Sequence, residues 1–144
     1  MKIAFTIPGA PCGKGRPRFS TAGKFPRAYT DDKTARYENL VKLAAMAEMD
    51  AMGIGGIAPR EGSVTVNIAA YFPVPASWSR KRRYDALDGV ISPTGKPDAD
   101  NIAKVICDSL NGIVYRDDAQ VAELTVEKHY GATPCVEVEV FTND

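Results

Sequence analysis

The order of apolar patterns along this 144-residue chain predicts a single α+β domain, with two main helices and a mixed, mainly antiparallel sheet. Four segments alternate apolar and polar residues at the two-residue period of a strand, and two others repeat apolar residues at helical spacing. In chain order the elements are β-α-β-α-β-β. The length suits one compact unit, and no internal repeat divides it, so we expect one domain over residues 1–144.

The first predicted strand covers residues 2–8, where Ile3, Phe5 and Ile7 share one face. A segment rich in Gly, Pro and cations follows at 9–30. It looks too irregular for helix or sheet, and long loops inside compact domains are usually functional or disordered.

The first predicted helix lies within residues 30–53. Thr30 or Asp31 can cap its start, acidic residues fill its first turn, and Gly53 can end it. Its inward stripe is predicted at four positions: Leu40, Leu43, Ala44 and Ala47.

A second strand is predicted at 63–72, whose apolar face is Val64, Val66, Ile68, Ala70 and Phe72. Pro73 and Pro75 stop it. The basic stretch "SWSRKRRYDALDG" then predicts a short helix opened by Ser77.

The second main helix is predicted within the stretch "GKPDADNIAKVICDSLNG", residues 95–112. Its inward stripe is Ile102, Val105, Ile106 and Leu110. Two strands are predicted after it, over 122–130 and 135–141, and we expect them to form a hairpin with one solvated face.

The net charge of zero hides a segregation of charge along the chain. Residues 1–40 hold eight Lys and Arg against three Asp and Glu, whereas residues 117–144 hold one Lys against seven acids. The block "SRKRRY" adds four consecutive cations. This asymmetry predicts a basic face for an anionic partner.

Three cysteines without CxxC spacing, Cys12, Cys107 and Cys135, argue against a disulfide framework or a zinc site. We expect Cys107 to be a buried thiol. Apolar runs fall well short of a membrane span, and the N-terminus lacks the pattern of a signal peptide. The sequence therefore predicts a cytoplasmic protein without a membrane partner.

Two acidic pairs flank the second main helix: Asp98 with Asp100, and Asp117 with Asp118. Helix capping explains one aspartate of the first pair well, but it explains neither its neighbour nor the second pair. Two carboxylates about 4 Å apart repel by about 4 kcal/mol at an effective dielectric of 20. Such a cluster persists if a cation neutralises it, if one group is protonated, or if it stays solvated.

The segment "GIVYRDD" is long enough to return alongside the helix and bring the two pairs together. Carboxylate oxygens suit Mg²⁺, or Mn²⁺, so Asp98, Asp100 and Asp118 are candidate metal ligands. Lys104 lies four residues after Asp100 and either forms a surface ion pair or reaches this site to stabilise an oxyanion. Asp108 is expected to be a solvated partner of Lys104, and it remains a candidate ligand.

The stretch "KPDADNIAKVICDSLNGIVYRDDAQV" resembles the signature of the RusA family of Holliday junction resolvases. The family pattern is D-x-D-N, a Lys four residues after the second Asp, D-[AS]-L-N-G and D-D-[AS]-Q. The blocks "GKGRPRF" and "PASWSRKRRYDAL" are also similar to this family, so the resemblance covers residues 1 to about 125.

The resemblance implies a small homodimeric, Mg²⁺-dependent endonuclease of bacteria or their phages, including prophages, that cuts four-way DNA junctions symmetrically during recombination and repair. It implies catalytic roles for Asp98, Asp100, Lys104 and Asp118, with Asp117 beside the last. Some members carry Arg immediately before the first Asp, where this chain has Pro97, preceded by Lys96.

Cations interleaved with aromatic residues suit nucleic acid, because cations bind phosphates and rings stack on exposed bases. The alternative is a solvated surface beside core aromatics. The cations expected to bind DNA are Lys14, Arg16, Arg18, Arg80, Lys81, Arg82, Arg83 and Lys96.

Three functions remain open from the sequence. The first is a Mg²⁺-dependent junction endonuclease acting on branched DNA as a homodimer, with one active site per chain for two symmetric nicks. The second is a non-catalytic DNA-binding module whose acids only cap helices. The third is a DxD nucleotide-sugar transferase, for which 144 residues are few and a nucleotide-binding βα unit is missing.

Overall fold

The computed structural model describes residues 1–15, 18–20, 23, 27–29 and 32–143. They form one α+β domain with a four-stranded mixed sheet and three helices, as predicted. The sheet consists of β1 (Lys2–Pro8), β4 (Val64–Pro73), β5 (Val121–Gly131) and β6 (Cys135–Thr142). The helices are α1 (Asp32–Ala51), α2 (Arg80–Leu87) and α3 (Ala99–Ser109), and a 3₁₀ turn, η1, covers Asp118–Gln120.

The strand order in the sheet is β1-β6-β4-β5, in which β4 and β5 run parallel and the other neighbours antiparallel. The predicted hairpin of the last two strands is wrong, because β4 lies between β5 and β6. Strand β6 takes an interior position between β1 and β4, and its Val136, Val138 and Val140 are buried. The more polar β5 takes the edge, where one side of the strand stays solvated.

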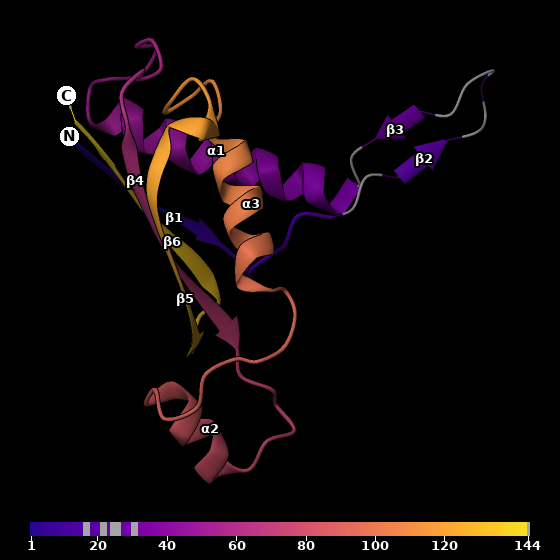
Figure 1. The fold of residues 1–144 in the computed structure, drawn as a ribbon. Helices are drawn as coiled ribbons and strands as arrows, with labels where there is room; N and C mark the ends of the chain where they lie inside the picture. The colour runs from indigo at the N-terminus through magenta and orange to yellow at the C-terminus, as the bar shows by residue number, and fades with distance from the viewer. Residues whose placement is uncertain (16–17, 21–22, 24–26, 30–31, 144) are drawn as a thin grey trace.

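Helices α1 and α3 pack on one face of the sheet, whereas α2 projects beyond the end of it (Figure 1). The predicted apolar faces of β1, β4 and β6 all point into the core between helices and sheet. The predicted stripe of α3 is also confirmed, since Ile102, Val105, Ile106 and Leu110 are fully buried.

The predicted inward stripe of α1 is partly wrong. The buried residues of this helix are Thr34, Tyr37, Val41, Ala45 and Met49. Leu43 is 64% exposed and Ala47 is exposed, while Leu40 and Ala44 pack at the margin of the core. The buried face begins with a threonine and a tyrosine, which the search for apolar residues did not count. The predicted stripe therefore starts at Leu40 instead of Val41, one residue too early.

The segment after β1 is more regular than predicted, because β2 (Arg18–Ser20) and β3 (Arg27–Tyr29) pair as antiparallel strands. The capping predictions for Thr30 and Asp31 lie outside the described residues. Gly53 follows the end of α1 with φ +75, as its predicted stop requires. Ser79, rather than Ser77, caps α2, accepting a hydrogen bond from the backbone N–H of Arg82.

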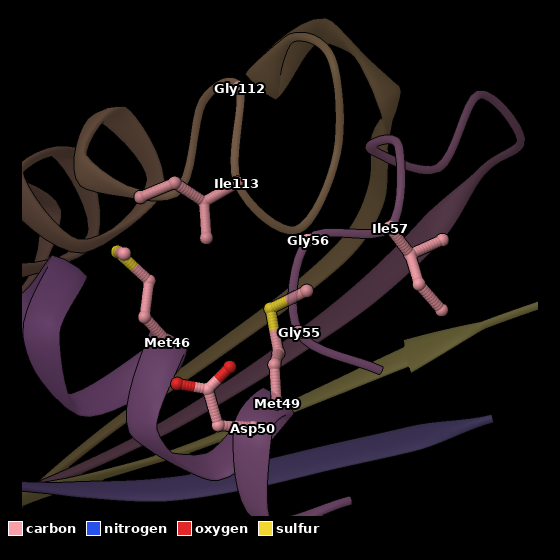
Figure 2. Close-up of a pocket in the computed structure, with 8 residues that line it drawn as sticks. All are labelled: Met46, Met49, Asp50, Gly55, Gly56, Ile57, Gly112 and Ile113. Atoms are coloured by element: carbon pink, nitrogen blue, oxygen red, sulfur yellow. The ribbon is translucent and has the colours of Figure 1, made fainter. Parts of the chain in front are cut away.

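A small pocket of about 180 Å³ lies between the end of α1 and the two loops at 55–57 and 112–113 (Figure 2). Met46, Met49, Ile57 and Ile113 give it a mainly apolar wall, and Asp50 adds a carboxylate. This lining offers too few polar groups for ion chemistry. Among the described helices, none is both long and apolar enough to cross a membrane.

Candidate active site

The start of α3 places the first acidic pair on separate sides of the helix. Asp98 occupies the N-cap position with extended backbone, yet its side chain accepts no capping hydrogen bond from the first turn of α3, all of which is described. Instead its carboxylate pairs with Lys96, 2.9 Å from the Nζ atom. Side-chain capping therefore does not account for Asp98.

Asp100 lies two residues further on and faces a groove of about 390 Å³ between α3 and β5. Because helical residues four apart share a face, Asp100, Lys104 and Asp108 line the same side of α3. The opposite wall comes from the strand that follows η1. The lining residues are Asp100, Ala103, Lys104, Cys107, Asp108, Asp118, Val121, Ala122 and Leu124.

The two aspartates of the second acidic pair, Asp117 and Asp118, have different positions in the structure. Asp117 caps η1, accepting a hydrogen bond from the backbone N–H of Ala119 at 3.3 Å. Asp118, the next residue, lines the groove. The returning segment was expected to bring Asp117 or Asp118 beside Asp98 and Asp100. In the structure Asp118 lines the same groove as Asp100 and Lys104, while Asp98 stays at the mouth of α3 and does not line the groove.

Gln120 anchors this turn to the loop before β4. Its Oε1 atom accepts a hydrogen bond from the N–H of Asp117, which completes a capping box. Its Nε2 atom donates to the carbonyl oxygens of Arg60 and Gly62, both at 2.8 Å. Glutamine supplies both a donor and an acceptor here, and this fixes the direction in which Asp118 leaves the turn.

Asp108 and Asp118 face each other closely enough for their carboxyl groups to share a hydrogen bond. That contact with Asp108 raises the pKa of Asp118 above its ordinary value, and burial adds to the effect. Burial alone would raise the pKa of Asp108, but the hydrogen bond from Asp118 and the charges of Lys104 and Lys14 lower it. The pair is a like-charge contact that a cation in the groove would relieve.

Two lysines surround Asp108. Lys104 lies 3.4 Å from its Oδ2 atom across one helical turn, and this lysine is 62% exposed. The Nζ atom of Lys14, from the loop after β1, lies 3.4 Å from the same Oδ2 atom and also binds Glu38 of α1 at 3.0 Å. The predicted pairing of Asp108 with Lys104 is confirmed. The prediction that Asp108 is solvated is wrong, because its side chain is only 20% exposed and also pairs with Lys14.

The floor of the groove is a rigid apolar layer. Cys107 is buried, as predicted, and burial raises the pKa of its thiol to about 11, so it is not a nucleophile at neutral pH. The fully buried Tyr115 donates a hydrogen bond of 2.6 Å from its hydroxyl to the carbonyl oxygen of Cys107. This bond ties the returning segment to the last turn of α3 and positions the residues that follow.

The predicted DNA-binding cations fall in three places. Arg80, Lys81, Arg82 and Arg83 all lie on α2, at the end of the molecule where α3 begins (Figure 1). Arg82 stacks on Trp78, 3.9 Å from its ring centroid, and Trp78 meets Tyr130 edge-on.

The other predicted cations lie nearer the N-terminus or the mouth of α3. Arg18 begins β2, Lys96 pairs with Asp98, and Lys14 lies beneath the groove. Arg16 falls outside the described residues. The side chain of Lys96 is 83% exposed, beside Asp98.

The donors at this groove fit a hard divalent cation in their chemistry, since Asp100, Asp108 and Asp118 all offer carboxylate oxygens to one open space. Across the described ranges, no three acidic, histidine or cysteine side chains stand close enough together to form a complete metal cluster. A metal ligated by Asp98, Asp100 and Asp118 therefore remains a prediction, which requires Asp98 to turn from Lys96 toward the groove.

The sequence did not identify the roles of Glu38 and Gln120. Glu38 lies on α1, far from the motif in sequence, and nothing in its helical spacing marks it as a partner of Lys14. Gln120 was visible as the last letter of the D-D-A-Q pattern. Its spacing of three from Asp117 is that of a capping box, which is the signal that identifies its role.

Comparison with known proteins supports the resemblance carried by these motifs. Residues 8–141, nearly the whole chain, match the family described as Endodeoxyribonuclease RusA. The chain is also similar to a Bacillus subtilis (strain 168) protein described as "Uncharacterized protein YqaN". The two are 35% identical over 140 residues, which cover 96% of this chain and 94% of that protein.

Proposed function

Because the chain belongs to the RusA endodeoxyribonuclease family, we propose that it resolves four-way DNA junctions by paired, Mg²⁺-dependent hydrolysis of phosphodiester bonds. One observation carries the proposal. Asp100 and Lys104 of α3 and Asp118 of the turn after it line a single groove, while Asp117 is turned aside to cap η1. Acids that served only as caps would not need this convergence.

Asp100 and Asp118 would hold the metal, with Asp98 as the third ligand. The pair between Asp98 and Lys96 is exposed, and such pairs contribute little energy, so its rearrangement costs little. When bound, Mg²⁺ or Mn²⁺ would activate water and stabilise charge that develops on the scissile phosphate. Open carboxylates without His or Cys donors favour these metals over zinc.

Lys104 would supply a fixed positive charge beside the scissile phosphate. Its side chain is 62% exposed and lines the groove, and its ammonium group pairs with Asp108 one helical turn further on. A positioned cation of this kind stabilises the negative charge that accumulates in the transition state. Lys96 would hold a neighbouring phosphate once Asp98 turns toward the metal.

The four cations of α2 would bind the DNA arms outside the groove. The Arg82 guanidinium lies over the Trp78 ring, 3.9 Å from its centroid, and this cation–π contact ties α2 to the segment before it. We propose that the protein works in the cytoplasm as a homodimer, because one chain has one such groove and two symmetric nicks require two.

The direct experiment incubates the purified protein with a labelled four-way junction, with and without Mg²⁺. We expect paired symmetric nicks with Mg²⁺ that disappear in Asp98→Asn, Asp100→Asn and Asp118→Asn, but persist in Asp117→Asn. Junction binding without cleavage in either Mg²⁺ or Mn²⁺ would contradict the proposal and favour a DNA-binding module. Turnover of a sugar nucleotide with no response to junctions would favour a transferase.

A further inference from the structure

Lys14 is a predicted DNA-binding cation whose side chain is partly buried, with 23% of it exposed. The loop that carries it is fixed on both sides. The N–H of Lys14 donates to the carbonyl oxygen of Asn101 in α3, and the N–H of Gly15 donates to the hydroxyl of Thr34 in α1. Gly13 fits so closely that an added Cβ would stand 3.0 Å from the Cβ of Pro97.

The side chain of Lys14 spans two helices. Its Nζ atom lies 3.0 Å from Glu38 of α1 and 3.4 Å from Asp108 of α3. The three side chains are only 23%, 17% and 20% exposed, whereas Lys81 on α2 is 89% exposed. A phosphate approaching Lys14 would compete with the two carboxylates that already pair with it.

Asp108 connects this contact to the groove. Its Oδ2 atom lies 3.4 Å from the Nζ atoms of both Lys14 and Lys104, and its carboxyl group interacts with that of Asp118. Holding Asp108 in place therefore constrains a side chain that contacts two predicted catalytic residues, Lys104 and Asp118. Partners of this kind, which touch the reacting groups without reacting themselves, orient them and are commonly needed for full metal affinity or activity.

We propose that Lys14 is a positioning residue of the endonuclease site, which holds Asp108 so that Asp118 and Lys104 are correctly placed, and that it does not bind DNA phosphate. This proposal rests on the proposed function and replaces the sequence-based prediction of a DNA contact for Lys14. Glu38 completes the arrangement as the second carboxylate partner of the lysine.

The test separates positioning from phosphate binding by their different readouts. Lys14→Met removes the charge at similar length, and Lys14→Arg retains it. Lys81→Met is the comparator for an exposed cation, and Lys42→Met is a control on α1. Each protein is measured for its cleavage rate at saturating junction, for Mn²⁺ affinity by electron paramagnetic resonance, and for the salt dependence of metal-free junction binding.

We expect Lys14→Met to lose about 10-fold or more in cleavage rate or Mn²⁺ affinity, with Lys14→Arg recovering much of the loss. The slope of log affinity against log salt should stay at the wild-type value in Lys14→Met. In Lys81→Met this slope should fall by about 0.9 for each phosphate that the lysine no longer neutralises. Lys42→Met should match the wild type in all three measurements.

A reduced salt slope in Lys14→Met with unchanged Mn²⁺ affinity would overturn the proposal, and so would wild-type behaviour in every measurement. If Lys14→Met does not fold, the double variant Lys14→Met/Glu38→Gln removes both charges together, and the same expectations apply to it. Failure of the wild-type protein to cut junctions would refute the proposed function, while Mn²⁺ affinity and salt slope would still decide the role of Lys14.

Discussion

Replacing Asp118 by asparagine should make the protein more stable while it abolishes cleavage. Asp118 faces Asp108, and this contact raises the pKa of Asp118 above the ordinary value of 3.8. The folded state therefore binds that proton more tightly than the unfolded state does, and the charged form at neutral pH is a cost to folding. Asparagine keeps the size of the side chain and removes the charge.

The size of the gain follows from the geometry and the solvent. Two unit charges about 4 Å apart repel by about 1 kcal/mol in bulk water and about 4 kcal/mol at an effective dielectric of 20. Asp118 is partly exposed, and both Lys104 and Lys14 lie beside Asp108, so screening favours the lower end. We expect a gain of about 0.5–1 kcal/mol, or an increase in Tm of about 2–3 °C.

The assay is thermal or urea unfolding in buffer with a chelator, from pH 3 to pH 8. In the wild type, ionisation of Asp118 lowers the free energy of unfolding as the pH rises from 3.8 through the raised pKa of the folded state. Above that pKa the loss of stability is complete. The advantage of Asp118→Asn should therefore be complete near pH 7 and should disappear below pH 3.8.

The neighbouring aspartate provides the matched control. Asp117 caps η1, so Asp117→Ala should destabilise the protein by about 0.5–1 kcal/mol through loss of the cap. Equal destabilisation by Asp118→Asn and Asp117→Ala at pH 7 would refute the division of roles. An advantage of Asp118→Asn that persists unchanged at pH 3 would show that repulsion from Asp108 is not its cause.

Three further predictions concern parts that position the groove or bind DNA beside it. Gln120→Leu should cost about 1–3 kcal/mol in urea unfolding and lower cleavage, because the hydrogen bonds of its side chain to the carbonyl oxygens of Arg60 and Gly62 and to the N–H of Asp117 are lost; an unchanged stability would contradict this anchoring role. Gly13→Val should cost about 1–3 kcal/mol by forcing the loop away from Pro97 and Asn101, and an unaltered Tm would refute that close fit. Arg82→Ala should weaken junction binding and lower its salt slope by about 0.9, measured by fluorescence anisotropy, whereas an unchanged slope would exclude a phosphate contact.

Alternation and helical spacing predicted most of the framework correctly, because buried strands and α3 bring uniformly apolar residues to the core. They failed where the core includes other residue types. In α1 the inward face begins with Thr34 and Tyr37, whereas the apolar Leu43 lies on the exposed face of the helix. Spacing alone could not distinguish the two faces of that helix.

Strand order was a different kind of failure. Neighbouring strands at the end of a chain usually pair, but β6 buries three valines and inserts between β1 and β4. The strand order depends on which strands gain most from an interior position in the sheet. The alternation of residues within one strand gives no information about that comparison.

For the site, motif spacing predicted that Asp117 or Asp118 would return beside Asp98 and Asp100. Asp118 and Asp100 do line one groove, whereas Asp98 lies outside it, so the predicted set of three ligands stays a prediction. The pairing of Lys14 with Glu38 and Asp108 was inaccessible, because it depends on how a loop crosses two helices. A basic residue in an apparently exposed, cation-rich segment gave no sign that it would lie beneath the groove.

Titration of the metal-binding variants with Mn²⁺, followed by electron paramagnetic resonance, tests most directly whether the acidic groups converge on one ion. We expect Asp100→Asn and Asp118→Asn each to lose at least about 10-fold in Mn²⁺ affinity, while Asp117→Asn binds as the wild type does. Wild-type affinity in Asp118→Asn, or an equal loss in Asp117→Asn, would contradict the shared metal site in this groove.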